Sequence, residues 1–235
     1  MPTVVVALGV VLLAYLLGCF STGYYVVRLR TGQDLRTIGS GATGGRNVAR
    51  VLGPAGFLLT GAGDLAKSVV AVGVPIWLGL GALEVAAAMV AVTAGHIWPF
   101  QLGFRGGKGI APFVGATALV APLALVAGAV LAAVAVLLSR RPNIGGMTGF
   151  AAAPAVALAL GQPILIAVGI FVVVALGAIA HRSNLREELR SAPSQTSRRR
   201  LAGPLQAAGR LPGAGRLPFI GRWTAESPGG GSSDG

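Results

Sequence analysis

Several long stretches of this chain contain no charged residue, and three of them decide what it can fold into. They cover residues 69–83, 109–139 and 142–180, which is 15, 31 and 39 residues. A membrane-spanning helix needs about 20 predominantly apolar residues. Backbone N–H and C=O groups inside lipid must bond one another, so the chain is helical there. The sequence therefore predicts an all-α protein with several transmembrane helices.

Composition agrees with this prediction. The mean hydropathy is +0.75, 54% of the residues are hydrophobic and 11% are charged, which is unusual for a soluble domain. The net charge of +12 is best explained by the positive-inside rule and by attraction to anionic lipid, so no nucleic-acid partner is expected. The single cysteine, Cys19, excludes an intrachain disulfide.

The positions of Lys and Arg predict a topology. They form four clusters, at residues 28–67, 105–108, 140–141 and 182–222. If all four face the cytoplasm, the apolar stretches cross the membrane about seven times and the N-terminus lies outside. The weak point is 109–139, which is short for two full spans at about 1.5 Å per residue. Short or broken helices buried in protein would fit, and the alternative is a single tilted helix.

The predicted crossings are distributed unevenly along the chain. One crossing falls within residues 4–27, and two fall within each of 68–104, 109–139 and 142–180. We expect a transmembrane domain over residues 1–191. Residues 192–235 are rich in Pro, Gly, Ser and Arg, cannot bury a core, and are expected to form a disordered cytoplasmic tail.

Three polar stretches interrupt the apolar sequence. They are RTIGSGATGGRNVAR at 36–50, HIWPFQLGFRGGKGIAP at 96–112 and HRSNLRE at 181–187. The predicted topology puts all three at the cytoplasmic boundary, where they could build one site. Glycine-rich loops that lead into a helix suit an anion, because backbone N–H groups and the helix dipole converge there. Arg50, Arg105 and Lys108 could pair with phosphate oxygens.

The remaining polar residues have two interpretations each. His96 alone is more often a packed or interfacial histidine than a functional one. His181 could be a helix-end cation or a proton acceptor. Asp64 and Lys67 are three residues apart on one helical face, so they either take part in the site or orient the arginines. No metal-ligand cluster, Rossmann fingerprint, Walker loop or convincing Ser/His/Asp order is present, so we expect no metal and no cofactor.

The motifs resemble those of the bacterial membrane-integral acyltransferases that use acyl phosphate to acylate glycerol 3-phosphate. GHIWPFQLGFRGGKGIA closely matches the family pattern GHxxPxxxxFxGGKGxA. GSGATGGRNVARVLG is similar to GSGNxGATNxxRxxG, and HRSNLRE is similar to HxxNIxR. The resemblance covers roughly residues 11–190, and it implies seven helices with the N-terminus outside a bacterial plasma membrane.

The resemblance also implies roles for individual residues. The expected catalytic residues are Ser40, Arg50, Lys108, His181 and Asn184. The expected phosphate-binding residues are Gly41, Asn47, Arg105, Gly106, Gly107 and Gly109. His96, Asp64 and Lys67 are expected to support the site.

The implied function is transfer of a fatty acyl group from acyl phosphate to glycerol 3-phosphate, which forms lysophosphatidate in phospholipid biosynthesis. The first motif departs from the family pattern: Ala42 replaces Asn, Gly45 replaces Ala and Arg46 replaces Thr. The family's Gly-Thr-Glu segment after the third motif is missing. These departures leave two alternatives open, namely a different phosphorylated acceptor, or a degenerate relative that binds or transports an anionic lipid or small solute without catalysis.

Overall fold

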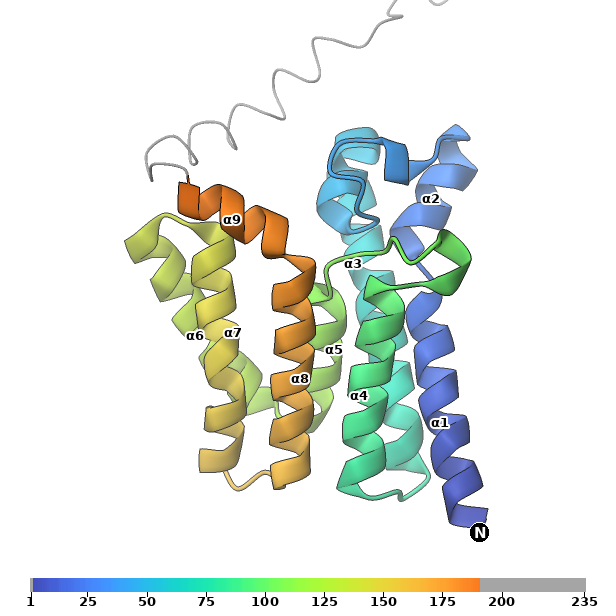
Figure 1. Ribbon diagram of the computed structural model, residues 1–235, viewed down its shortest axis with the longest axis vertical. Coiled ribbons are helices and arrows are strands. Elements are labelled where there is room, and N and C mark those ends of the chain that lie inside the picture. Colours follow the sequence, from blue (N-terminus) through green and yellow to red (C-terminus); the bar gives the residue numbers. More distant parts are fainter. Residues whose placement is uncertain (1, 191–235) are drawn as a thin grey trace, which may run out of the picture.

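The computed structural model describes residues 2–190, and all regular structure in this part of the chain is helical (Figure 1). The predicted tail, residues 192–235, lies outside the described residues. The long helices run side by side as a bundle, with the start of α1 at the end opposite the polar loops. Its elements are α1 (Pro2–Cys19), α2 (Thr22–Thr31), α3 (Gly45–Trp77), α4 (Ala82–Ile97), α5 (Ile110–Val120), α6 (Pro122–Ser139), α7 (Pro142–Ala159), α8 (Ile164–Ala180) and α9 (Arg182–Arg190), with short 3-10 helices at Leu35–Thr37 and Phe100–Leu102.

The membrane prediction is confirmed, with a qualification on the count. Counting α1 and α2 as one interrupted helix and leaving out α9 turns nine α-helices into seven. By length and apolarity, four spans among the described residues could cross a membrane, or five if α8 and α9 form one bent span. The stretch 109–139 is two helices that break at Ala121, before Pro122, as the short-helix interpretation expected. At 11 residues, α5 is too short to cross alone.

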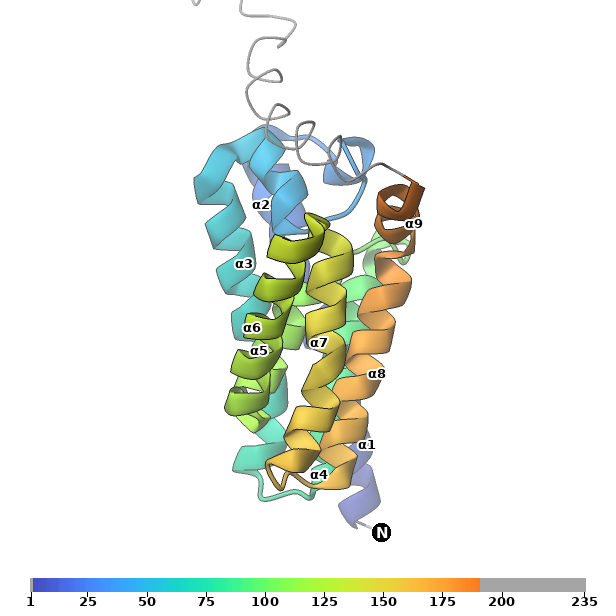
Figure 2. The same ribbon diagram turned by 90° about the vertical axis from the view of Figure 1, so that its left-hand side faces the viewer.

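The long element α3 is two helices. Gly53 has φ +67° and ψ −162°, and Pro54 follows it, so the helical hydrogen bonding breaks there. A Cβ placed on Gly45 would lie 3.2 Å from the backbone oxygen of Phe57, which shows that residues 45–52 fold back along the helix that follows. Figure 2 shows this reversal at the upper end of α3. The first motif therefore lies over the end of the bundle.

Small residues allow the helices to approach closely. A Cβ on Gly149 of α7 would lie 2.2 Å from the backbone nitrogen of Ala132 in α6, and one on Gly18 of α1 would lie 2.2 Å from the backbone oxygen of Val92 in α4. The core between the helices includes Met89 and fully buried aliphatic side chains. Large apolar side chains on the outside, such as those of Leu123 and Phe171, are exposed, as expected for surfaces that face lipid.

Candidate active site

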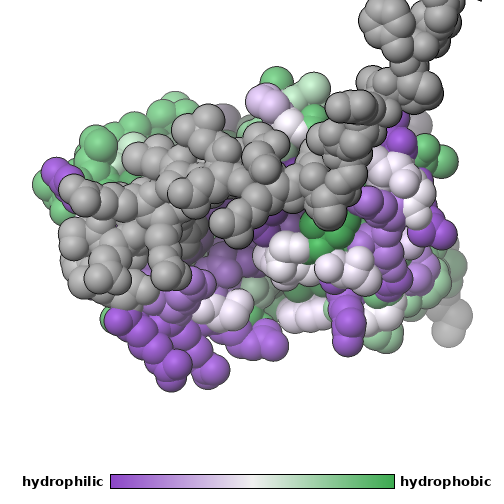
Figure 3. Space-filling model, turned by 90° about the horizontal axis from the view of Figure 1, so that it is seen from above, coloured by the Kyte–Doolittle hydropathy of each residue, from purple (hydrophilic) through white to green (hydrophobic). Residues whose placement is uncertain are grey.

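The three polar stretches lie together at one end of the bundle, as the sequence analysis expected (Figure 1). The first motif and the glycine-rich loop are joined directly, because the Thr43 N–H donates to the Gly106 carbonyl at 3.2 Å. The third motif begins where α8 gives way to α9, which is bent away from α8 by 62°. Viewed from this end, hydrophilic residues form much of the visible described surface (Figure 3).

Asn47 organises the first motif from inside. Its amide nitrogen donates to the carbonyls of Leu35 and Ile38 at 3.2 and 2.8 Å, and its Oδ1 accepts from the Ser40 N–H at 3.2 Å. The same Oδ1 accepts from Arg50 at 3.0 Å, and Asn47 is buried. Asn47 therefore shapes the loop, while Ser40 and Arg50 are exposed at its surface.

The loop before α5 is shaped by its glycines; we call residues 103–109 the phosphate loop. The N–H groups of Gly106 and Gly107 donate to the carbonyls of Ile97 and His96 at 3.1 and 3.0 Å. A Cβ on Gly107 would lie 2.0 Å from His96 Nε2, so a side chain cannot fit there. Gly109, with φ +83°, begins α5. Two of the N–H groups expected to bind phosphate thus bond to carbonyls at the end of α4 instead, whereas Lys108 lines a pocket.

His96 is held from beneath by a buried ion pair. Lys67 Nζ lies 3.0 Å from Asp64 Oδ1 and 3.0 Å from His96 Nδ1. The ammonium also donates to the carbonyls of Gly18 and Phe20, at 2.9 and 2.6 Å, where α1 ends. Thr22 donates its hydroxyl to Asp64 at 3.1 Å. Asp64, Lys67 and His96 thus connect α1, α3 and α4 directly under the phosphate loop, and their supporting role in the site stays a prediction.

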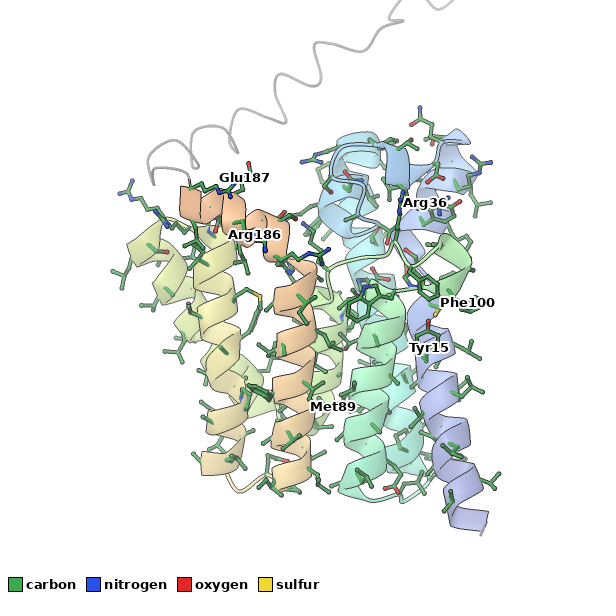
Figure 4. All side chains as sticks on the ribbon, viewed as in Figure 1. Tyr15, Arg36, Met89, Phe100, Arg186 and Glu187 are labelled. Atoms are coloured by element: carbon green, nitrogen blue, oxygen red, sulfur yellow. The ribbon has the colours of Figure 1, made fainter. Side chains whose placement is uncertain are left out.

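Sequence reasoning missed a second connection between the loops. Arg36 donates to the Leu102 carbonyl at 2.8 Å and to the Asp34 carboxylate at 2.6 Å, and its guanidinium lies over the Tyr24 ring (Figure 4). The hydrogen bond with Arg36 lowers the pKa of Asp34 to about 2. The Asp-x-Arg spacing of Asp34 and Arg36 is visible in the sequence, but Leu102, the other partner of Arg36, is 66 residues away.

His181 and Lys108 meet at the mouth of an apolar pocket. His181 Nδ1 lies 2.9 Å from the Gly177 carbonyl, and because a carbonyl only accepts, the ring proton is on Nδ1 and Nε2 of the neutral ring is an acceptor. Lys108 and Arg46 lie within electrostatic range of this ring. Asn184 is half-buried on the first turns of α9, and Arg105 is exposed.

The pocket that these two polar groups line is small, with a cavity volume of about 20 Å³. Its wall is formed by apolar side chains from α5, α7 and α8: Ile110, Phe113, Met147, Phe150, Val173 and Val174. The rings of Phe113 and Phe150 are in contact, with their centroids 4.7 Å apart. A lysine beside apolar side chains suits a molecule with a negatively charged head and a hydrocarbon chain.

Helix α9, which carries the third motif, is attached to α7 through Glu188 and Asn143, two residues that sequence reasoning also missed. Glu188 of α9 is fully buried, and its carboxylate accepts from the N–H groups of Asn143 and Ile144 at 3.0 and 2.9 Å. A carboxylate at a helix N-terminus is favourable because it binds otherwise unpaired N–H groups. Among the described residues, no group of three or more His, Cys, Asp or Glu could hold a metal ion.

Comparison with known proteins assigns the chain to a family. The sequence profile of the glycerol-3-phosphate acyltransferases matches residues 8–191. Glycerol-3-phosphate acyltransferase 1 of Desulfitobacterium hafniense is 40% identical over 182 residues, which is 77% of this chain and 90% of that protein. The enzyme of Thermus thermophilus is 35% identical over 180 residues, 77% of this chain and 90% of its own.

Solved structures agree with the sequence comparison. The crystal structure of PlsY, an integral membrane glycerol 3-phosphate acyltransferase, in its glycerol 3-phosphate form superposes with a TM-score of 0.71 at 29% identity, covering 78% of this chain and 92% of PlsY. The lysophosphatidic acid form gives 0.67 at 25% identity, covering 87% and 99%. The chain is therefore an integral membrane protein that belongs to the glycerol-3-phosphate acyltransferase family.

Proposed function

We propose that this protein transfers a fatty acyl group from acyl phosphate to glycerol 3-phosphate, which gives lysophosphatidate and inorganic phosphate. The observation that carries the proposal is the position of Lys108 and His181 at the mouth of the apolar pocket. The donor's phosphate would lie against Lys108, and its hydrocarbon chain would lie along the apolar side chains of α5, α7 and α8. A relative that is 40% identical is a glycerol-3-phosphate acyltransferase, and PlsY has been crystallised in a glycerol 3-phosphate form and in a lysophosphatidic acid form.

In the proposed reaction, a hydroxyl oxygen of glycerol 3-phosphate attacks the acyl carbon. A new C–O ester bond forms, the C–O bond to phosphate breaks, and phosphate leaves with the electron pair. The hydroxyl proton passes to His181 Nε2, which is the acceptor nitrogen of the neutral ring. Lys108 stabilises the charge that develops on the leaving phosphate. Ser40 and Arg50, exposed at the first motif, would hold the acceptor's phosphate, with Asn184 completing the site.

The loop glycines and the buried residues take supporting roles in this proposal. Gly41, Gly106, Gly107 and Gly109 set the backbone path, and Asn47 fixes the loop that presents Ser40 and Arg50. Arg105, exposed beside the phosphate loop, would attract the anionic substrates. We assign the reaction to a domain of residues 1–191, with residues 192–235 as a separate cytoplasmic tail.

The purified protein tests the reaction directly. With acyl phosphate and glycerol 3-phosphate we expect phosphate release together with formation of lysophosphatidate. Lys108→Ala should lower kcat by about 10²–10³-fold while the protein still folds, because a charge-stabilising donor is lost. Near-normal turnover in this variant would contradict the role of the loop. Absence of phosphate release from the unaltered protein would favour a non-catalytic relative that binds anionic lipid.

We also propose a bacterial plasma membrane location with the N-terminus outside and the active site in the cytoplasm. The support is the clustering of Arg and Lys at the loop end of the bundle. Single cysteines in a Cys19→Ser background test the orientation. In intact cells, an impermeant thiol reagent should label Glu84→Cys, at the far end, and should not label Arg140→Cys. The reverse pattern would overturn the orientation.

A further inference from the structure

Arg46, which departs from the family's first motif, reaches across the site to α7. Its Nη1 lies 3.4 Å from Asn143 Oδ1, although the two residues are 97 positions apart. Arg46 is in the first turn of α3 and Asn143 is in the first turn of α7. A separation of 3.4 Å is long for an N–H···O bond, so this contact with Asn143 is a weak one. The long side chain of Arg46 thus connects α3, which begins in the first motif, to α7, which lines the pocket.

Asn143 can present only its oxygen to Arg46. Its Nδ2 donates to Glu188 Oε1 at 2.7 Å, and a carboxylate can only accept, so the amide orientation is determined by the network. The backbone N–H of Asn143 donates to the same carboxylate at 3.0 Å. Both residues are buried, with 5% of Asn143 and none of Glu188 exposed. Asn143 is therefore a fixed acceptor whose orientation is imposed from the third-motif helix α9.

The guanidinium lies near the pocket, because its contact Asn143 belongs to α7, the helix that supplies Met147 and Phe150 to the pocket wall. Arg46 and Lys108 both lie within electrostatic range of His181, and Lys108 and His181 line the pocket mouth. Arg46 itself is exposed, so a substrate can reach it. A planar guanidinium can bind two phosphate oxygens at once, which neither a lysine nor the threonine of the family pattern can do.

We infer that Arg46 is a specificity-determining residue of this chain that binds the phosphoryl group of the acyl donor, with Asn143 and Glu188 as positioning residues. The inference rests on the proposed function. The group recognised is the phosphate of an acyl phosphate whose chain lies along the apolar side chains of the pocket wall. As the C–O bond to phosphate breaks, the departing phosphate gains negative charge, and Arg46 shares it with Lys108.

Steady-state kinetics of Arg46→Thr in the purified full-length protein test the inference. We expect KM for acyl phosphate to rise about tenfold, the loss of one charge-assisted contact, while KM for glycerol 3-phosphate changes little. Arg46→Lys should lower KM for acyl phosphate part of the way back, because it restores the positive charge without the planar guanidinium that binds two phosphate oxygens. Arg30→Thr is the matched control, since it removes an arginine from the exposed end of α2 on the same side, and it should leave both constants unchanged.

Asn143→Ala tests the positioning role. It should raise KM for acyl phosphate by a smaller factor than Arg46→Thr, and it should add nothing further in the Arg46→Thr background, because the two act as a unit. Thermal unfolding in detergent verifies that both variants fold. An active wild-type enzyme whose acyl phosphate KM is unchanged by Arg46→Thr would overturn the inference and leave the proposed function standing. A rise confined to KM for glycerol 3-phosphate would overturn it too. A wild-type protein without phosphate release would instead overturn the proposed function itself.

Discussion

The contact of α3 with α1 and α4 differs in kind from that between α6 and α7. The first buries the Asp64–Lys67 pair together with His96. The second is made by small residues, with Gly149 directly against Ala132. Packing of small residues is therefore enough to join two helices in this protein. Buried charge, which is costly in a membrane, occurs where helix ends must hold the phosphate loop. We conclude that the α6–α7 contact serves stability and the α3 contact serves the site.

The largest effect is expected from breaking the charged contact. Lys67→Met leaves the Asp64 carboxylate buried without its ammonium, which should cost about 3–5 kcal/mol of stability. Replacing both partners, as Asp64→Leu with Lys67→Met, should restore part of that stability, because apolar pairs often substitute for buried ion pairs. Activity should stay low in the double variant, since His96 loses its partner beneath Gly107. Thermal unfolding measures stability and phosphate release measures activity. Full activity in the double variant would contradict the assignment of the α3 contact to the site.

Changing the contact between Gly149 and Ala132 should affect stability and leave activity nearly unchanged. Gly149→Val forces α7 away from Ala132 and should lower stability by about 1–3 kcal/mol through overpacking, with little change in activity per folded molecule. Gly146 on the same helix has no neighbouring atom within 4 Å, so Gly146→Ala is the control and should be neutral or stabilising by up to about 1 kcal/mol. If Gly149→Val kept its unfolding temperature and lost turnover, the assignment of this contact to stability would be wrong.

A pocket variant sharpens the comparison, because α7 also lines the pocket. Phe150→Ala removes one ring of the Phe113–Phe150 pair and enlarges the cavity. We expect the preference, measured as the ratio of kcat/KM for longer and shorter acyl phosphates, to shift toward longer chains by about tenfold. Phe171 lies on α8 with 61% of its surface exposed, so Phe171→Ala is the control and should leave the ratio unchanged. An unchanged ratio in Phe150→Ala would place the acyl chain elsewhere.

The smallest effect is expected at the half-buried Asp34–Arg36 pair. The pKa of Asp34 is lowered from 3.8 to about 2, chiefly by its hydrogen bond with Arg36. A carboxyl whose pKa is depressed stabilises the folded state above about pH 4 and loses that contribution as the pH falls toward 2. Wild type should therefore unfold at a slightly higher temperature than Asp34→Asn at pH 7, and the difference should shrink below about pH 4 and largely vanish near pH 2. A constant difference across this range would show that the charge of Asp34 plays no part.

Much of this arrangement was accessible from the sequence. The apolar stretches predicted the helical membrane fold, and Pro122 marked the break in 109–139. The glycines and Lys108 marked the loop. The network of Arg46, Asn143 and Glu188 was not accessible, because its members are far apart in sequence and ordinary in type. Glu188 looked like one of several charges on a surface helix, and only the bend between α8 and α9 turns it toward the start of α7.

The ammonium of Lys67 also imposes an order on how the protein is made. Asp64 and Lys67 are three residues apart in α3, so they enter the bilayer together as a pair without net charge, which lowers the cost of insertion. The carbonyls of Gly18 and Phe20 obtain their donor only when Lys67 arrives. During synthesis, α1 is translated before α3, so it reaches its final hydrogen bonding only after Lys67 has followed it. The end of α1 is thus completed by a residue that enters the membrane after it.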